Sequence, residues 1–490
     1  MNSSINRRTT TPGREGSPLL VLLLLALFIR GGILFPSLSS FDEDPDDYAR
    51  LADNWSSRGV FGKGDQATAF RPPLYPWTLK EIKFLQDRER GSKTGAPDSS
   101  FLSKLALSRN ASVALWHWIL GIATVLTVYR LALTCSLSPR LAALAGLLVA
   151  IDPILLWQSR FVMTETLATF FSAVLLLATV SCVRNRTSKW SGAYFALLGA
   201  IFGLSTLCRP TFFAFAGLVL MGFIWVDAKE LFRAKRDKDA NPQRFAALGS
   251  AVRVFLFLLG LGVVVGPWVL RNWREFERPI ATTTHGGYTL HLANNPELYS
   301  HYREAPRTPW NPDKFHRLRA IELEEALASA GVVPGSKEAE LFQDAWHKEK
   351  ARKTVAENPR VFALACLERT KELWRLVPNE APGAQNRTRS QKARLAVGVF
   401  YGIEFFLALL GVVGVVRKPK RFNDGCAKFA ETPFLWGAAI ILSVQTPHLI
   451  YWTNMRMRAP LEPFIAILAV CGLSLIVGNR LNPPKNALDR

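Results

Sequence analysis

Cysteine is scarce in this chain of 490 residues, and the six cysteines follow no pairing pattern. They stand at positions 135, 182, 208, 366, 426 and 471, mostly within or beside long apolar runs, without the spacing of metal ligands. The sequence therefore indicates neither a disulfide framework nor a zinc site. We expect most of these cysteines to be free thiols in an apolar core.

Nucleotide-binding motifs are also missing. The two long segments that separate apolar runs, 38–110 and 271–394, contain no GxxxxGKS/T and no GxGxxG. The formal charge of +21 is spread over short connectors instead of being gathered on one folded domain, as a nucleic-acid footprint would be. We therefore expect no nucleic-acid partner and no reaction that depends on a bound nucleotide.

Long apolar runs, in contrast, dominate the chain. Hydrophobic residues make up 49% of it and occur in blocks with few charges. Each block has roughly 20 residues, enough to cross about 30 Å of hydrocarbon. The pattern predicts an all-α polytopic membrane protein embedded in the lipid bilayer. We expect about ten spans, at 18–37, 111–134, 141–158, 164–183, 191–208, 210–226, 247–270, 395–416, 433–452 and 459–478.

The basic residues between the runs indicate the orientation. Lys and Arg concentrate in the N-terminal tail 1–17, in the connectors 184–190, 227–246 and 417–432, and in the C-terminal tail 479–490. Short connectors rich in positive charge stay on the cytoplasmic side, so all five segments are expected there, which requires an even number of spans. The first run resembles a signal peptide but lacks a small-x-small cleavage site, and we interpret it as a retained anchor.

This topology divides the chain into parts. Between the cytoplasmic tails 1–17 and 479–490, we expect a transmembrane catalytic module at 18–270 that includes the first long segment, 38–110, then the second long segment, 271–394, and C-terminal spans at 395–478. Both long segments are expected on the extracytoplasmic side. Residues 341–376 carry an apolar stripe broken at Asn358-Pro359, which predicts two amphipathic helices packed on each other or lying at the membrane interface.

An acidic cluster follows the first run, in the stretch Phe41–Trp55. It contains five carboxylates in an otherwise basic protein: Asp42, Glu43, Asp44, Asp46 and Asp47. A carboxylate at the membrane surface can accept the proton of an attacking hydroxyl, and Asp44, Asp46 and Asp47 are the candidate bases. The same acids equally fit a solvated helix start just outside the bilayer. Adjacent acids can also bind a divalent cation, so a metal cofactor is an open alternative. We assign no residue as a metal ligand.

Single arginines accompany this cluster on the expected outer side. Arg71 and Tyr75 lie in the proline-stiffened sequence FRPPLYP. An arginine beside a span is usually an anchor that reaches for the interface. Arg209 and Glu165 depart from that rule, since Arg209 is flanked on both sides by apolar runs and Glu165 begins a span. The remaining candidates for substrate contact are Arg160, Arg271, His285, Arg456 and Arg458.

Together these residues predict one active site. Several guanidinium groups can hold a phosphate or diphosphate through paired hydrogen bonds. They would also stabilise the negative charge that develops on a phosphate leaving group. A carboxylate nearby can take the proton of the attacking hydroxyl. The combination fits sugar transfer from a lipid phosphate carrier.

The order of the motifs is similar to that of a known group. After the first span comes D…Y…LA.N, followed by RPPLYP, P……SR…TE, a mid-chain RP, PW..RN…TT..GG..L..NNP and a late R.R.P.EP. This order resembles the polytopic membrane glycosyltransferases of the GT-C class. The most similar group contains dolichyl-phosphate-mannose protein mannosyltransferases, the bacterial aminoarabinose transferase of lipid A and lipopolysaccharide-modifying relatives. The resemblance runs from Leu19 to Val477.

The resemblance implies an enzyme that moves a sugar from a polyprenyl-phosphate donor to a glycan, lipid or protein acceptor of the cell envelope. It implies a general base at Asp46 or Asp47, a donor-phosphate contact at Arg71 and a substrate-positioning role for Glu165. We expect the bacterial inner membrane, with the site facing outward. The chain departs from the group's pattern in having several adjacent acids. It also lacks a large C-terminal soluble domain, which argues against a protein acceptor of the mannosyltransferase type.

Two other interpretations stay open. A transporter or flippase of lipid-linked sugars would use the same arginines, but it should contain broken helices and charges at mid-depth of the bilayer. Most ionisable residues here stand at the ends of predicted spans, which favours surface chemistry. A non-catalytic assembly subunit would tolerate loss of the acidic cluster.

Overall fold

The structure is a computed structural model that describes residues 16–91, 108–236, 241–304, 310–379, 391–422 and 429–478. The predicted tails lie almost wholly outside the described residues, as does Cys426. In the described part the fold is helical, apart from one short antiparallel hairpin of β1 (Gly62–Lys63) and β2 (Gln66–Ala67). The expectation of an all-α protein is confirmed.

Nine helices of the described part are long and apolar enough to cross a membrane. Two of these candidate spans combine a 3-10 helix with an α-helix. The nine are α1 (Gly16–Leu34) with η1 (Phe35–Asp42), α5 (Arg109–Leu133), α8 (Glu165–Arg184), α9 (Ser191–Cys208), α10 (Thr211–Arg236), α11 (Asn241–Phe276), α17 (Gln391–Arg417), α18 (Pro433–Ile450), and η5 (Met455–Leu461) with α19 (Glu462–Val477). The chain is therefore an integral membrane protein.

One of the ten predicted spans, 141–158, is not a single helix, so that prediction is wrong. Residues Pro139–Ile151 form α6, whose 13 residues extend about 20 Å. Asp152 then leaves the helical conformation, and Pro153 starts α7 (Pro153–Gln158). The Asp152 carboxylate accepts a hydrogen bond from the Leu155 backbone N at 2.7 Å and so caps the new helix. Proline fits at this first helical position because it has no N–H to satisfy.

Glycines allow the tightest helix pairs in the bundle. A Cβ added to Gly199 on α9 would lie 1.9 Å from the Phe257 carbonyl oxygen of α11. A Cβ on Gly472 of α19 would meet the Leu407 carbonyl oxygen of α17 at the same 1.9 Å. Only a residue without a side chain fits such an approach, which is a common device between membrane helices.

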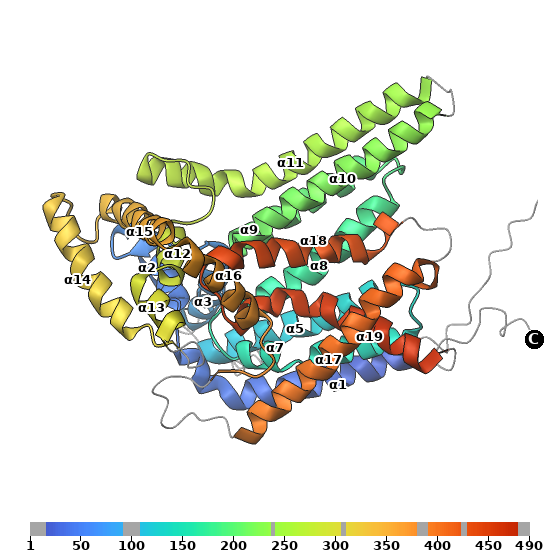
Figure 1. The fold of residues 1–490 in the computed structure, drawn as a ribbon, viewed down its shortest axis with the longest axis horizontal. Coiled ribbons are helices and arrows are strands. Elements are labelled where there is room, and N and C mark those ends of the chain that lie inside the picture. Colours follow the sequence, from blue (N-terminus) through green and yellow to red (C-terminus); the bar gives the residue numbers. More distant parts are fainter. Residues whose placement is uncertain are drawn as a thin grey trace, which may run out of the picture.

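The two long segments cover one end of the bundle, which we call the site end (Figure 1). The first contributes α2 (Tyr48–Arg58), the hairpin and α3 (Leu74–Gly91). The second contributes α12 (Gly286–Ala293), α13 (Pro296–Glu304), α14 (Asp313–Ser329), α15 (Lys337–Glu357) and α16 (Pro359–Leu373). The predicted break at Asn358-Pro359 is confirmed, because α15 ends and α16 begins there.

The basic connectors lie at the other end of the bundle. The turn between α8 and α9, the facing ends of α10 and α11, and the short helices η3 (Pro419–Phe422) and η4 (Phe429–Glu431) are all found there (Figure 1). The long segments and the basic connectors are thus separated by the length of the spans. This is the arrangement that the distribution of Lys and Arg predicts.

Candidate active site

Asp46 is the acid of the cluster that the fold turns inward. Its Oδ1 accepts a hydrogen bond from Arg71 Nη2 at 2.9 Å, and the two side chains are 19% and 17% exposed. Its Oδ2 lies 3.8 Å from Arg456 Nη2. The next residue, Asp47, has φ 61°, a left-handed conformation that reverses the chain into α2. Asp46 and Asp47, on either side of this turn, have different partners.

Asp44 and Asp47 have other partners. Asp44 Oδ2 accepts a hydrogen bond from the Arg50 backbone N at 3.1 Å and so holds the first turn of α2. Burial raises the pKa of Asp44, although hydrogen bonds from the α2 backbone act in the opposite direction. Asp47 pairs with Arg50 Nη2 at 2.6 Å, and both side chains are about half exposed. The three candidate bases therefore differ in kind: Asp46 faces the arginines, Asp44 supports a helix and Asp47 lies at the surface.

Glu165 and Arg209 form a second, deeper ion pair. Glu165 begins α8, and its buried Oε1 lies 2.8 Å from Arg209 Nη2. Arg209 lies at the junction of α9 and α10, where its Nε also donates to Thr164 Oγ1 at 3.1 Å. Arg456 of η5 joins this pair to the first one, because its Nε is 3.8 Å from Glu165 Oε1 while its Nη2 is 3.8 Å from Asp46.

These five side chains form what we call the ion-pair network: Asp46, Arg71, Glu165, Arg209 and Arg456. It contains three guanidinium groups and two carboxylates, which leaves one positive charge in excess. Arg71 Nε and Arg456 Nε are buried and find no hydrogen-bond acceptor in the described part of the chain. An anionic group would supply both the missing charge and the missing acceptors.

His285 and Tyr48 flank Arg71. His285 Nε2 lies 3.4 Å from Arg71 Nη1, and the guanidinium carbon of Arg71 is 5.6 Å from the centre of the Tyr48 ring. Burial, with help from the Arg71 charge, lowers the pKa of His285 to about 3, so the imidazole is neutral at physiological pH. Burial also raises the pKa of Tyr48. The sequence singled out His285 but not Tyr48, whose only signal was the Y of the D…Y…LA.N motif.

Tyr75 and Arg160 lie beside the network. The buried Tyr75 hydroxyl shares a hydrogen bond with His117 Nε2 at 2.9 Å, and its ring packs edge-on against Tyr48. It therefore supports a residue of the site instead of facing the arginines itself. Arg160 Nη2 donates to Ser40 Oγ at 3.2 Å, and its guanidinium stacks on Trp157. These contacts tie α7 to η1.

Arg271 and Arg458 were expected to contact substrate, but the structure gives them internal partners. Arg271 donates to the backbone carbonyls of Thr68 and Phe61 at 2.8 and 2.9 Å, which clamps the hairpin onto α11. Arg458 is completely buried: its Nε donates to Glu462 at 2.7 Å and its Nη1 to the carbonyl oxygens of Leu373 and Arg375. Both guanidinium groups serve to hold elements together.

A buried carboxylate cluster near Arg458 escaped the sequence analysis. Oxygens of Asp152, Glu404 and Glu462 lie within 4.8 Å of one another, and all three residues are buried. Among the described residues, these three acids are close enough together to share a metal ion. Arg458, which pairs with Glu462, already supplies a positive charge beside them. The signal was Glu404, an acid in the middle of an apolar run. Charges inside the spans are thus more common than we expected.

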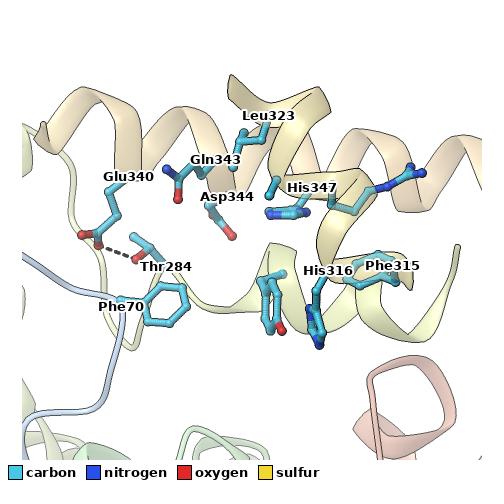
Figure 2. A pocket seen from close by; sticks show the side chains of 12 residues that line it. Phe70, Thr284, Phe315, His316, Leu323, Glu340, Gln343, Asp344 and His347 are labelled. Carbon is cyan, nitrogen blue, oxygen red and sulfur yellow. Dashed lines mark hydrogen bonds between the residues drawn. The ribbon is translucent and has the colours of Figure 1, made fainter. Parts of the chain in front are cut away.

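Two cavities are lined by residues that neighbour Arg71 in the sequence. One has a volume of about 240 Å³, is bounded by Phe70 and by helices α12, α14 and α15, and has a mixed polar and aromatic lining (Figure 2). The other has a volume of about 530 Å³ and is mainly apolar, with Pro73, Leu74 and Trp77 on one wall and residues of α9 and α11 on the other. Phe70 therefore faces one cavity and Pro73 the other, while Arg71 between them holds Asp46.

Sequence comparison links part of this chain to a known family. The model of the family described as dolichyl-phosphate-mannose-protein mannosyltransferase matches residues 99–236. The resemblance to the GT-C glycosyltransferases is confirmed for this part of the chain. No curated protein matches the sequence significantly.

Solved structures of two enzymes are among those similar to this chain. The archaeal oligosaccharyltransferase AglB from Archaeoglobus fulgidus, in complex with an inhibitory peptide and a dolichol-phosphate, has 14% identity and a TM-score of 0.45, covering 94% of this chain and 50% of that one. The same enzyme with Zn and sulfate has 13% identity and a TM-score of 0.48, covering 93% and 49%. ArnT from Cupriavidus metallidurans, bound to undecaprenyl phosphate, has 14% identity and a TM-score of 0.35, covering 95% and 79%. This chain thus spans about half the length of AglB.

Proposed function

We propose that this protein is a membrane glycosyltransferase that takes a sugar from a polyprenyl-phosphate donor, with Asp46 as the general base. The observation that carries the proposal is the set of partners of Asp46: this one carboxylate is bound to Arg71 and lies next to Arg456, in a network with an excess of positive charge. A transfer site needs a base, an anion-binding group and separate places for donor and acceptor. Asp46 and the arginines supply the first two, and we assign the two cavities to the donor and the acceptor.

The apolar cavity suits the lipid part of the donor. Its walls carry Trp55, Trp77 and Trp268 together with leucine and proline side chains, and Trp77 is itself 46% exposed. Pro73 and Leu74 belong to the same short segment as Arg71. A polyprenyl chain lying along this wall would bring its phosphate to the arginines of the ion-pair network. Apolar burial would then contribute to donor affinity, and Arg71 would orient the phosphate.

The reaction follows from this placement. A hydroxyl oxygen of the acceptor attacks the anomeric carbon of the donor sugar, and the bond from that carbon to the phosphate oxygen breaks. Asp46 takes the hydroxyl proton. The electron pair of the broken bond leaves with the polyprenyl phosphate, whose negative charge is stabilised by Arg71 and the excess positive charge of the network. The acceptor is a hydroxyl-bearing glycan, lipid or protein of the cell envelope.

A transporter of lipid-linked sugars remains the second candidate, since the helix break at Asp152-Pro153 and the acids inside the spans are features of such proteins. The test is an assay of the purified protein in liposomes with polyprenyl phosphate carrying a radiolabelled sugar. A glycosyltransferase separates the label from the lipid phosphate and passes it to an acceptor fraction from envelope extracts. A transporter moves the intact donor between leaflets and leaves the sugar–phosphate bond unbroken.

We place the site end on the extracytoplasmic side, in a bacterial inner membrane. An introduced cysteine tests this side. Asp65, in the hairpin turn, has an 83% exposed side chain, and Lys189 is exposed at the opposite end of the bundle. A membrane-impermeant thiol reagent should label Asp65→Cys in intact spheroplasts and label Lys189→Cys only after lysis. The reverse pattern would contradict the proposed orientation.

A further inference from the structure

We infer that the cavity of about 240 Å³ bounded by Phe70, α12, α14 and α15 is the acceptor subsite, and that it takes a sugar ring. This inference rests on the proposed function and names the chemical class of acceptor, a glycan that is either free or carried by a lipid. The apolar cavity of about 530 Å³ is left for the donor.

The lining of this acceptor cavity combines flat rings with hydrogen-bonding groups. In Figure 2, Gln343 and Asp344 project from α15 on one side, and Phe70 and His316 lie across from them. A sugar ring has the matching character, because its C–H faces pack against aromatic rings while its hydroxyls need donors and acceptors. An acyl chain would leave the polar groups unsatisfied.

The rings are held in fixed positions. Tyr288 and His316 stack with an angle of 14° between their planes and 6.3 Å between their centres. Tyr288 also packs edge-on against His347, which shares a buried hydrogen bond of 2.9 Å with His291. Rings fixed in this way lose little further freedom when a ligand packs on them, so binding costs less entropy.

Asp344 is equally well fixed, and the polar groups of the lining keep capacity for a ligand. Asp344 accepts hydrogen bonds from the Gly287 backbone N at 2.7 Å and from Lys348 at 2.6 Å. Each carboxylate oxygen can accept more than one hydrogen bond, so both remain available to sugar hydroxyls. Gln343 adds an amide that can donate and accept. His285 Nδ1 is buried and unpartnered within the described residues, next to this cavity.

The volume argues for a single ring. Sites for drug-sized ligands occupy about 300–1,000 Å³, and this cavity is smaller than that range. The apolar cavity, at about 530 Å³, falls within it. A monosaccharide unit, with the rest of the glycan outside in solvent, is the fragment that fits.

The acceptor cavity is connected to the base through His285 and Arg71. Phe70 packs against His285 with ring centres 4.4 Å apart, and Tyr288 packs on the other side of His285 at 5.3 Å. His285 touches Arg71, which holds Asp46. We therefore expect the reacting hydroxyl to lie at the Phe70 side of the cavity, where this chain of contacts with Asp46 begins.

Binding of sugars can be measured without any turnover. We would record saturation-transfer NMR spectra of methyl hexosides and methyl pentosides with the purified protein. At least one should give signals that His316→Ala and Gln343→Leu abolish and that Lys314→Ala, an exposed change on the same helix as His316, leaves intact. Thermal unfolding checks that all variants are folded. Sugar signals that survive both cavity changes, or competition by a serine- or threonine-containing peptide instead of a sugar, would overturn the inference.

Turnover then separates this inference from the proposed function. With donor present, His316→Ala and Gln343→Leu should raise the KM for a glycan acceptor roughly tenfold, and the exposed change Lys314→Ala should leave that KM unaltered. A soluble oligosaccharide and a glycolipid in nanodiscs distinguish the two sources of the sugar. If the wild type consumes donor but the cavity variants keep their acceptor KM, the subsite is wrong while the transferase stands. If sugar binds in the cavity but no donor is consumed, the transferase is wrong.

Discussion

Arg456 and Arg458 stand two residues apart in η5, yet they belong to two different electrostatic environments. Arg456 is 28% exposed and lies 3.8 Å from each of two acids, Asp46 and Glu165. Arg458 is fully buried, 2.7 Å from Glu462, and bound to two backbone carbonyls. In the ion-pair network at the site end the arginines outnumber the acids, whereas in the buried cluster around Arg458 three acids surround a single arginine.

The comparison separates charges that hold the fold from charges available to a ligand. In the buried cluster Arg458 compensates acids that have no access to water, and it connects η5 with α16 and α19. Arg71, Arg456 and Arg458 each keep a buried nitrogen without an acceptor in the described structure, but only in the ion-pair network do the arginines outnumber the acids. Excess charge with spare donors is what a phosphate needs.

The largest expected effect is on stability, at Arg458. Arg458→Leu removes the guanidinium and leaves Glu462 buried without its partner, which should lower the free energy of unfolding by about 3–5 kcal/mol. Thermal unfolding in detergent measures the loss. The double variant Arg458→Leu/Glu462→Leu should recover much of it, because no unpaired charge remains. A stable single variant would show that Arg458 does not hold the buried cluster together.

The next effect is on catalysis, at Arg71. Arg71→Ala should lower kcat/KM for the donor by a factor corresponding to about 2–4 kcal/mol, because both the hold on Asp46 and the phosphate contact are lost. Arg71→Lys should recover only part of the activity, since an ammonium lacks the planar fork that binds two oxygens. Donor kinetics in liposomes give the values. Equal activity of the alanine variant and the wild type would remove Arg71 from the site.

Arg456→Leu is the matched change to Arg458→Leu. Because Arg456 has only long contacts with acids and is partly exposed, we expect a change in unfolding free energy of at most about 1 kcal/mol. The KM for the donor should rise, because the excess positive charge of the ion-pair network is lost. Unfolding and kinetics measured on the same preparation test both statements. A loss of stability as large as that of Arg458→Leu would erase the distinction between the two regions.

The smallest effect concerns pH. Burial lowers the pKa of His285 and His291 to about 3 and that of His347 to about 4, from an ordinary value of 6.5. Between these values the unfolded chain binds protons that the folded chain does not. Stability from these histidines is therefore complete above pH 6.5 and is lost as the pH falls toward 4 and then 3.

Hydrogen exchange, corrected for intrinsic rates, locates this loss. Amides of α12 and α15 should lose protection between pH 6.5 and 5, whereas the glycine-packed pair α17 and α19 should keep it. His347→Phe should make α12 less sensitive to pH, because one titrating group is gone. An equal loss of amide protection in both regions would show that these histidines do not cause the loss of stability at low pH.

Much of this architecture could be predicted from the sequence. Long apolar runs with basic connectors mark the spans, and Asn358-Pro359 marks a helix end, because these are local signals. The grouping of Asp46, Arg71, Glu165, Arg209 and Arg456 followed from placing each on the same side of the membrane. Side chains at the same ends of the spans can reach one another, whereas side chains at opposite ends cannot.

The rest depended on helix rotation and on long-range packing. Arg456 and Arg458 have the same local context, and only the direction in which η5 turns decides that one faces the ion-pair network and the other the buried cluster. Asp152, Glu404 and Glu462 come from three elements far apart in the chain, so no spacing rule brings them together. The break at Asp152-Pro153 has a local signal, a capping acid before proline, which the apolar run concealed.

The central claim is that one acid of the cluster, Asp46, carries the chemistry. Its most direct test is single-turnover transfer from radiolabelled polyprenyl-phosphate sugar by Asp46→Asn and Asp47→Asn, two neighbouring changes that each remove one carboxylate. Asp46→Asn should slow transfer at least about a hundredfold, while the protein still inserts into the membrane. Asp47→Asn should leave the rate within a factor of about two, because the exposed ion pair of Asp47 with Arg50 contributes little. Full activity of Asp46→Asn would contradict the account.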